Sequence, residues 1–166
     1  MTASIRLPFW ARRWLARRLA LPLPRKKTLR QSRRAAIYKV DRLGDFVLAT
    51  GALHTLFRHF GAEHCRLIVS EVAAPLAAVE FPTVERWVIP AQAAQVWREI
   101  RPLRARLAPI WTREKFTHLV CLRHARALHH DVTLSWLDAE EWHGLGKRPG
   151  PESLNLDNRP ELPADY

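Results

Sequence analysis

Short apolar runs alternate with longer stretches of helical periodicity along the middle of the chain. The apolar runs are residues 35–40, 65–70, 85–90 and 117–123. The stretches with helical periodicity are residues 46–60, 71–79 and 93–111. Strands that alternate with helices form parallel sheets with right-handed crossovers. The pattern therefore predicts an α/β fold, a Rossmann-like parallel sheet with flanking helices, in which Pro102 bends the last of these helices.

The two ends of the chain depart from this alternation. A helix is expected over residues 8–21, because proline is favoured at the first helical position and two further prolines follow its end. Residues 125–142 suit either a helix or a loop, and the sequence beyond them is rich in Gly, Pro and polar residues. We therefore divide the chain into a basic arm and linker (1–34), an α/β domain (35–150) and an irregular tail (151–166).

Positive charge is concentrated in the arm. The chain carries 27 Lys and Arg against 16 Asp and Glu, a net charge of +11. Eleven of the basic residues and none of the acidic ones lie in residues 1–34, so the remaining 16 basic residues balance the 16 acidic ones. Nucleic-acid-binding domains usually spread Lys and Arg over a folded face. The equal numbers of basic and acidic residues in the domain argue against a specific nucleic-acid partner. Nonspecific RNA binding by the arm is a lesser alternative.

The expected N-terminal helix combines tryptophan with arginine. Trp10, Arg13, Trp14 and Arg17 suit the headgroup region of an anionic membrane, where arginine can extend its guanidinium to the interface. We expect them to contact the inner face of the cytoplasmic membrane, which predicts a cytoplasmic, peripheral protein. A solvated basic tail and a helix docked on a protein partner are the alternatives. No 18-residue stretch is free of charge, so no transmembrane helix is expected.

The cysteines and histidines show no metal-binding spacing. Cys65 and Cys121 each lie in an apolar run, which predicts buried, reduced thiols. Of the eight histidines, His129 and His130 are consecutive with Asp131, whereas helical metal sites use residues four apart. No metal site is predicted.

The loop after the first expected strand is where a ligand is expected. Ligands of open α/β sheets bind beyond the carboxyl ends of the strands, and here that loop reads Val-Asp-Arg-Leu-Gly-Asp, residues 40–45. Gly44 lets the backbone approach a ligand closely. The loop has neither the G-x-G-x-x-G dinucleotide motif nor the G-K-[ST] of a phosphate-binding loop. Asp45 sits where a helix begins, so it is either a helix N-cap, a catalytic base, or both.

Residues 37–53, IYKVDRLGDFVLATGAL, resemble the N-terminal motif of family 9 glycosyltransferases, the heptosyltransferase type. Two later segments agree with it, RLIVSEVAAPL (66–76) and FTHLVCLR (116–123). The resemblance implies the N-terminal, acceptor-binding half of a GT-B fold. It also implies that Asp45 is the base that activates the acceptor hydroxyl, and that no metal or other cofactor is required. Further site residues implied on the acceptor side are Asp41, Arg42 and Gly44.

Two features depart from the family pattern. Gly51 stands where the family usually has proline, which changes the helix locally. The family also uses two Rossmann-like domains, which need about 300 residues, and the nucleotide-sugar donor is bound mainly by the second. This chain of 166 residues has room for one. We therefore expect a fragment, a truncated product or a half-enzyme that needs a separate donor-binding domain or subunit.

Three polar residues after the fourth expected strand are candidates for the same site. Arg123, His124 and Arg126 follow that strand, so parallel topology brings them to the edge where Asp45 lies. They either bind a phosphorylated or carboxylated acceptor or are solvated loop residues.

The leading hypothesis is a glycosyltransferase that transfers a sugar, plausibly heptose, to a lipopolysaccharide-type glycan or glycolipid acceptor. The alternative is a non-catalytic, membrane-peripheral α/β binding module or remnant. The chain would be an enzyme only if completed by a second domain.

Overall fold

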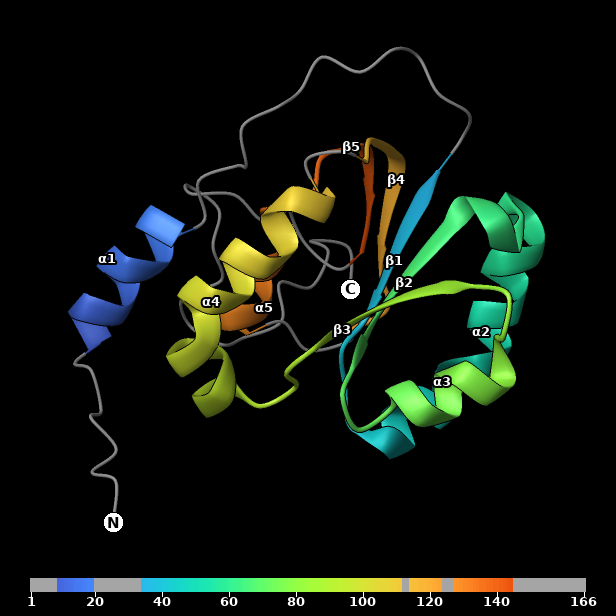
Figure 1. The fold of residues 1–166 in the computed structure, drawn as a ribbon, viewed down its shortest axis with the longest axis horizontal. Coiled ribbons are helices and arrows are strands. Elements are labelled where there is room, and N and C mark those ends of the chain that lie inside the picture. The colour runs from blue at the N-terminus through green and yellow to red at the C-terminus, as the bar shows by residue number, and fades with distance from the viewer. Residues whose placement is uncertain (1–8, 20–33, 112–113, 124–126, 145–166) are drawn as a thin grey trace, which may run out of the picture.

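The structure is a computed structural model that describes residues 9–19, 34–111, 114–123 and 127–144. Five strands form one sheet in the order β3-β2-β1-β4-β5, and every neighbouring pair is parallel (Figure 1). The strands are β1 (Ala35–Lys39), β2 (Cys65–Ser70), β3 (Glu85–Ile89), β4 (Phe116–Cys121) and β5 (Ala139–His143). The predicted Rossmann-like parallel sheet is confirmed, and β5 is a strand that the sequence pattern did not predict.

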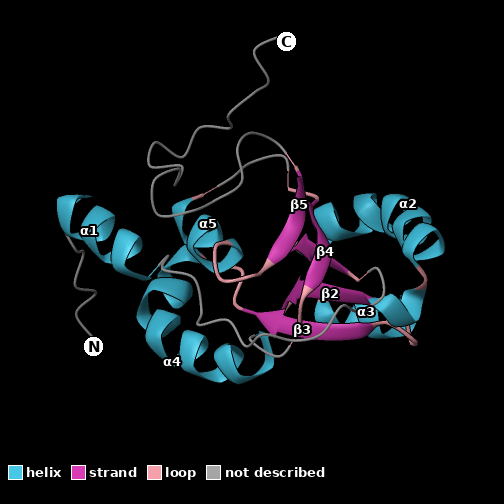
Figure 2. Ribbon diagram, turned by 90° about the horizontal axis from the view of Figure 1, so that it is seen from above, coloured by secondary structure: helices cyan, strands magenta, loops and turns pink. Residues whose placement is uncertain are grey.

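Helices cover both faces of the sheet. They are α1 (Phe9–Leu19), α2 (Leu43–Phe60), α3 (Ala74–Glu80), α4 (Ala93–Trp111) and α5 (Leu128–Leu134), with a short 3₁₀ turn, η1 (Ala62–His64). Viewed from above, α2 and α3 lie on one side of the strands and α1, α4 and α5 on the other (Figure 2). Pro102 and Pro109 lie on the exposed side of α4, and the helix continues past both. None of the described helices is both long and apolar enough to cross a membrane.

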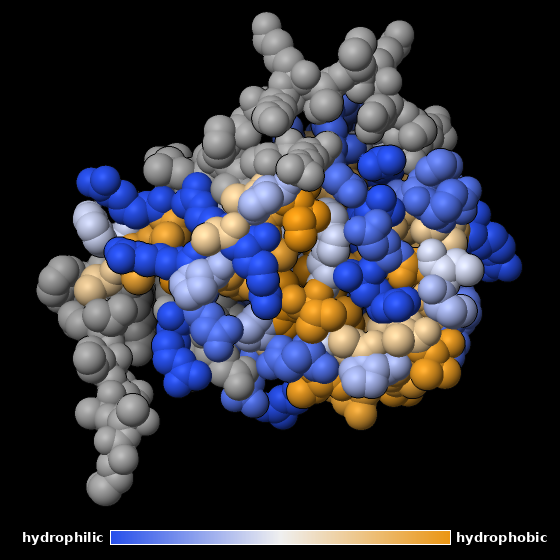
Figure 3. Space-filling view, viewed as in Figure 1, coloured by the Kyte–Doolittle hydropathy of each residue, from blue (hydrophilic) through white to orange (hydrophobic). Residues whose placement is uncertain are grey.

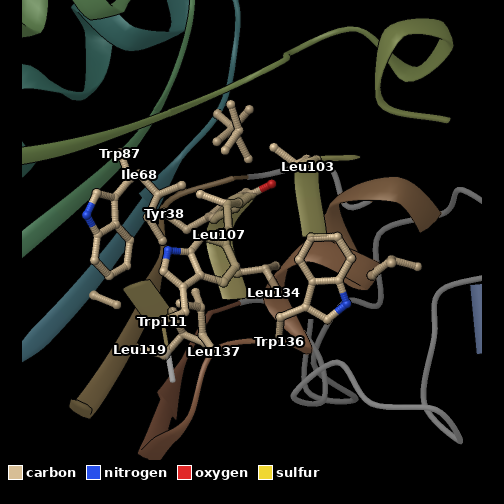
Figure 4. Packing of buried hydrophobic residues seen from close by; sticks show 14 of the residues in the cluster. Tyr38, Ile68, Trp87, Leu103, Leu107, Trp111, Leu119, Leu134, Trp136 and Leu137 are labelled. Atoms are coloured by element: carbon tan, nitrogen blue, oxygen red, sulfur yellow. The ribbon is translucent and has the colours of Figure 1, made fainter. Parts of the chain in front are cut away.

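Each face of the sheet has its own apolar core. The larger core lies under α4 and α5, where the rings of Trp87, Trp111 and Trp136 pack in series, with centroids 5.5 and 6.1 Å apart (Figure 4). The smaller core lies under α2 and α3 and includes Phe57 and Phe81 in edge-to-face contact. Cys65 and Cys121 are buried, reduced thiols, as predicted. Burial raises the pKa of Cys65 to about 11.

The N-terminal helix packs on the domain. Ala16 is fully buried and Leu19 nearly so, both in the larger core. The Leu19 carbonyl, at the end of α1, accepts hydrogen bonds from Trp136 Nε1 at 2.5 Å and Arg104 Nη1 at 3.0 Å. These bonds satisfy a helix-end carbonyl that has no partner within its own helix. The helix expected in the arm is therefore joined to α4 and α5 through its C-terminal end.

Candidate functional site at the carboxyl edge of the sheet

The strand order places a crevice site between β1 and β4. From β1 the chain crosses to β2 and then β3 on one side, and after α4 it returns to β4 and β5 on the other. The direction of winding reverses between β1 and β4, and the crevice outside their carboxyl ends is the usual ligand site of such sheets. The loops that follow these two strands carry Asp41 and Arg123, and Asp45 lies in the first turn of α2, directly after the first loop.

A buried ion-pair network lies at the carboxyl ends of β1 and β4. The Asp41 carboxylate lies 2.8 Å from Lys39 Nζ through one oxygen and 2.8 Å from Arg123 Nη1 through the other. All three side chains are at most 14% exposed. Lys39 Nζ also donates to the Leu122 carbonyl at 3.2 Å, and Ser70 Oγ donates to the Asp41 carbonyl at 2.6 Å. The network therefore ties together the ends of β1, β2 and β4.

Helix α2 begins immediately after this network, and Asp45 does not cap it. The N-cap is Arg42, whose backbone is extended and whose side chain makes no capping bond. Leu43 is the first helical residue, so Asp45 is the third. The interpretation of Asp45 as an N-cap is therefore wrong, because the helix starts three residues earlier than an Asp45 cap requires. A carboxylate in the first turn is still stabilised by the helix dipole.

The Asp45 carboxylate faces an open hollow and has no partner within the described part of the chain. Asp45 is partly buried and shares a shallow surface depression with Lys39, Leu48 and Ala49. No hydrogen bond or ion pair joins its carboxylate to a described residue. A carboxylate in such a position is available to accept a proton or a hydrogen bond from a bound molecule.

Apolar side chains form an exposed rim beside Asp45. Leu48 is 86% exposed, and Leu43, Val47 and Val72 are about half exposed. In Figure 3 apolar surface gathers over α3 and the start of α2, at the lower right. Contiguous exposed apolar surface on a domain commonly marks a contact with another domain, a ligand or a membrane.

The residues predicted for the site occupy different environments. Asp41 is buried and fully used by the network, so it supports the edge and does not face the hollow. Arg42 and Gly44 are exposed at the start of α2, and open space surrounds the Gly44 Cα. Arg123 is neither solvated nor free, because it pairs with Asp41 and donates to the Val40 carbonyl. His124 and Arg126 lie outside the described residues.

The residues predicted to contact a membrane are described in part. Trp14 is 58% exposed, and the Arg18 guanidinium lies 5.2 Å from the centroid of its ring. Both are on the side of α1 that faces away from Ala16. The side chains of Trp10, Arg13 and Arg17 lie outside the described part of the chain.

Sequence reasoning missed two polar groups at this edge. Lys39 ends a buried strand, and Asp41 follows it two residues later. A buried lysine so close to an aspartate is the signal that could have indicated an internal ion pair. Behind β1, the Tyr38 hydroxyl lies 2.8 Å from His130 Nδ1 and 2.9 Å from Thr133 Oγ1. This second group has no local sequence signal, because α5 is about 90 residues away from β1 in the chain.

Burial keeps the two histidines of α5 uncharged. It lowers the pKa of His129 to about 4 and that of His130 well below its usual value, and Arg123 adds to both shifts by repulsion. Burial likewise raises the pKa of the Tyr38 hydroxyl, so Tyr38 is protonated. The histidines are therefore neutral parts of the core.

These shifts predict that the fold loses stability in acid. The unfolded chain binds a proton at each histidine near pH 6.5, while folded His129 does so only near pH 4, so stability falls as the pH drops from 6.5 towards 4. Between pH 6 and pH 5 the wild type should lose about 1 kcal/mol more than His129→Gln. Urea unfolding at the two pH values measures this difference. Equal losses in the two proteins would contradict it.

The chain was compared with known protein families, with curated proteins and with solved structures, and none of the three comparisons gave a match.

Proposed function

We propose that residues 35–150 are the acceptor-binding half of a family 9-type glycosyltransferase, with Asp45 as its general base. The observation that carries the proposal is the Asp45 carboxylate, which has no hydrogen-bond or ion-pair partner among the described residues and lines an open hollow at the point where the sheet reverses its winding. The resemblance of residues 37–53 to the family motif supports it.

In the proposed reaction, Asp45 removes a proton while the acceptor attacks. The acceptor hydroxyl oxygen forms a bond to the anomeric carbon of the nucleotide sugar, and the bond from that carbon to the diphosphate oxygen breaks. The diphosphate leaves with the electron pair, and the hydroxyl proton passes to the Asp45 carboxylate. An ionised carboxylate can serve as this base, because the hydroxyl need lose its proton only as the new bond forms.

Neighbouring residues have separate roles in this proposal. The Lys39–Asp41–Arg123 network fixes the loops after β1 and β4 and so positions Asp45, and Lys39 also lines the hollow in which the acceptor would lie. Arg42 is exposed where α2 begins and suits a phosphate or carboxylate on the acceptor. The exposed start of α2, at Gly44, lets an acceptor approach the backbone.

The donor would be held by a separate domain or subunit. The hollow beside Asp45 is shallow and open, whereas a nucleotide sugar is normally enclosed on most of its surface. The apolar rim of Leu43, Val47, Leu48 and Val72 would form part of the contact with that donor-binding domain. Sugar transfer by the chain supplied with that domain, and its loss in Asp45→Asn, tests the proposal.

The second candidate is a membrane-peripheral binding module at the cytoplasmic face. The observation in its favour is the exposed pair of Trp14 and Arg18 on the outer side of α1. Tryptophan and arginine together suit the headgroup region of anionic lipid. Membrane attachment through α1 is compatible with either candidate function.

Vesicle flotation tests this attachment without disturbing the packing of α1. Arg18→Glu should reduce binding to phosphatidylglycerol vesicles by about tenfold, because each basic residue near an anionic surface contributes roughly 1 kcal/mol. Trp14→Ala should also weaken binding. Arg58→Glu makes the same charge reversal at an exposed position of α2. It is the matched control and should retain binding. Equal flotation of Arg18→Glu and Arg58→Glu would contradict attachment through α1.

A further inference from the structure

Three potential metal ligands meet on the β4–β5 side of the sheet. His118 of β4 lies opposite Glu141 of β5, and Val120 lies opposite His143. Because side chains alternate between the faces of a sheet, His118, Glu141 and His143 share one face. The His118 ring also packs on Phe60 in the last turn of α2, with centroids 5.0 Å apart. The cluster is therefore at the opposite end of α2 from Asp45.

The ligand atoms of this cluster form a nearly equilateral triangle. His118 Nδ1 lies 3.1 Å from His143 Nε2 and 3.2 Å from Glu141 Oε2, and the last two atoms are 3.4 Å apart. A tetrahedral zinc ion with bonds of about 2.0–2.2 Å holds its ligand atoms roughly 3.3–3.6 Å apart. The three atoms thus approach the spacing of one face of such a tetrahedron, and shifts of a few tenths of an ångström would complete it.

We propose that His118, Glu141 and His143 bind a zinc ion. Two imidazole nitrogens and one carboxylate oxygen are a donor set that zinc uses when its fourth position is left to water or another ligand. The side chain of His143 is 49% exposed and that of Glu141 is 62% exposed, so the ion has a path from solvent. The two imidazoles share a hydrogen bond, which zinc would replace with two bonds to the metal.

The zinc site would hold the edge strand β5 against β4. In the sheet, β5 pairs with β4 alone, and two of the three ligands come from β5. A metal that bridges the strands binds the folded chain in preference to the unfolded one, so zinc should raise the melting temperature, and the rise should grow with the logarithm of the zinc concentration above Kd. The role is independent of the proposed sugar transfer, because no ligand of the cluster takes part in the network at the carboxyl edge.

Zinc titration of the full, untagged chain by calorimetry tests the site. We expect one ion per chain and a higher melting temperature, reversed by EDTA. His143→Gln should weaken binding by about 100-fold or more, because even groups that only orient a metal ligand contribute 10–100-fold. Glu141→Ala, at another exposed ligand, is the second variant and should weaken zinc binding to a similar extent. His54→Gln is the matched control, since His54 pairs with Glu80 at 2.8 Å in an exposed site of two ligands.

Cobalt absorption gives a second readout. Co²⁺ in place of zinc should give visible bands typical of tetrahedral coordination in the wild type and in His54→Gln, and these bands should be absent in His143→Gln. No zinc binding by the wild type, or equal binding by wild type and His143→Gln, would overturn the proposal. Binding that is lost in His54→Gln and kept in His143→Gln would also overturn it.

Discussion

Asp45→Asn is expected to reduce the rate of sugar transfer by at least about 100-fold, in an assay that supplies the chain with a donor-binding domain. The amide keeps the shape of the carboxylate but cannot take the acceptor proton, and general-base effects start near this size. The fold should change little, because Asp45 makes no hydrogen bond or ion pair with any described residue. The expected loss is therefore in kcat, with the melting temperature almost unchanged.

Glu99→Gln is a suitable control for this experiment. It makes the same change from acid to amide on a helix of the opposite face, and it should leave transfer intact. Turnover of Asp45→Asn within a few-fold of the wild type would limit Asp45 to an electrostatic role in the first turn of α2. The proposed mechanism would then be wrong even if the chain binds acceptor.

Asp41→Ala is expected to lower the free energy of unfolding by about 3–5 kcal/mol. The substitution leaves Lys39 and Arg123 without the carboxylate that both of them contact, and breaking a buried ion pair from one side has an effect of this size. Three strand ends meet at this network, so the loss should appear as lower global stability. Urea unfolding at neutral pH measures it.

An exposed pair provides the comparison. Lys115 and Glu140 lie 3.0 Å apart with both side chains about half exposed, and Glu140→Gln should change stability by less than about 1 kcal/mol. Similar effects of Asp41→Ala and Glu140→Gln would mean that water reaches Lys39 and Arg123 easily. The network would then not be a rigid support for the loop that carries Asp45.

The sequence predicted most of the sheet because its strands are apolar runs. The five residues of β1 are all buried, so this strand has a clear signal in the pattern. By contrast β5 reads Ala-Glu-Glu-Trp-His, with three exposed positions spread over both faces, because it lies at the edge of the sheet. Its pairing with β4 depends on tertiary contacts that a local pattern does not contain. The meeting of His118 with Glu141 and His143 was not predicted for the same reason, since two of these residues are on β5.

The candidate site was predictable in position and less so in detail. The loop after β1 and Asp45 in it followed from the motif and from the rule for parallel sheets. The start of α2 was placed at Asp45 because aspartate is a favoured cap, whereas the extended Arg42 takes that position without a capping bond. The burial of Asp41 could not be inferred, because one of its two partners is 82 residues away along the chain.

The contact between Leu19 and Trp136 has a consequence for how the protein is made. These residues are 117 positions apart, and α1 cannot dock on α5 until the later residue has left the ribosome. At typical synthesis speeds this interval is roughly 6–23 s. During it, a basic segment that carries tryptophan and arginine is exposed beside a growing chain. The lipid contact proposed for α1 therefore has an interval during synthesis in which the contact with its own core does not compete.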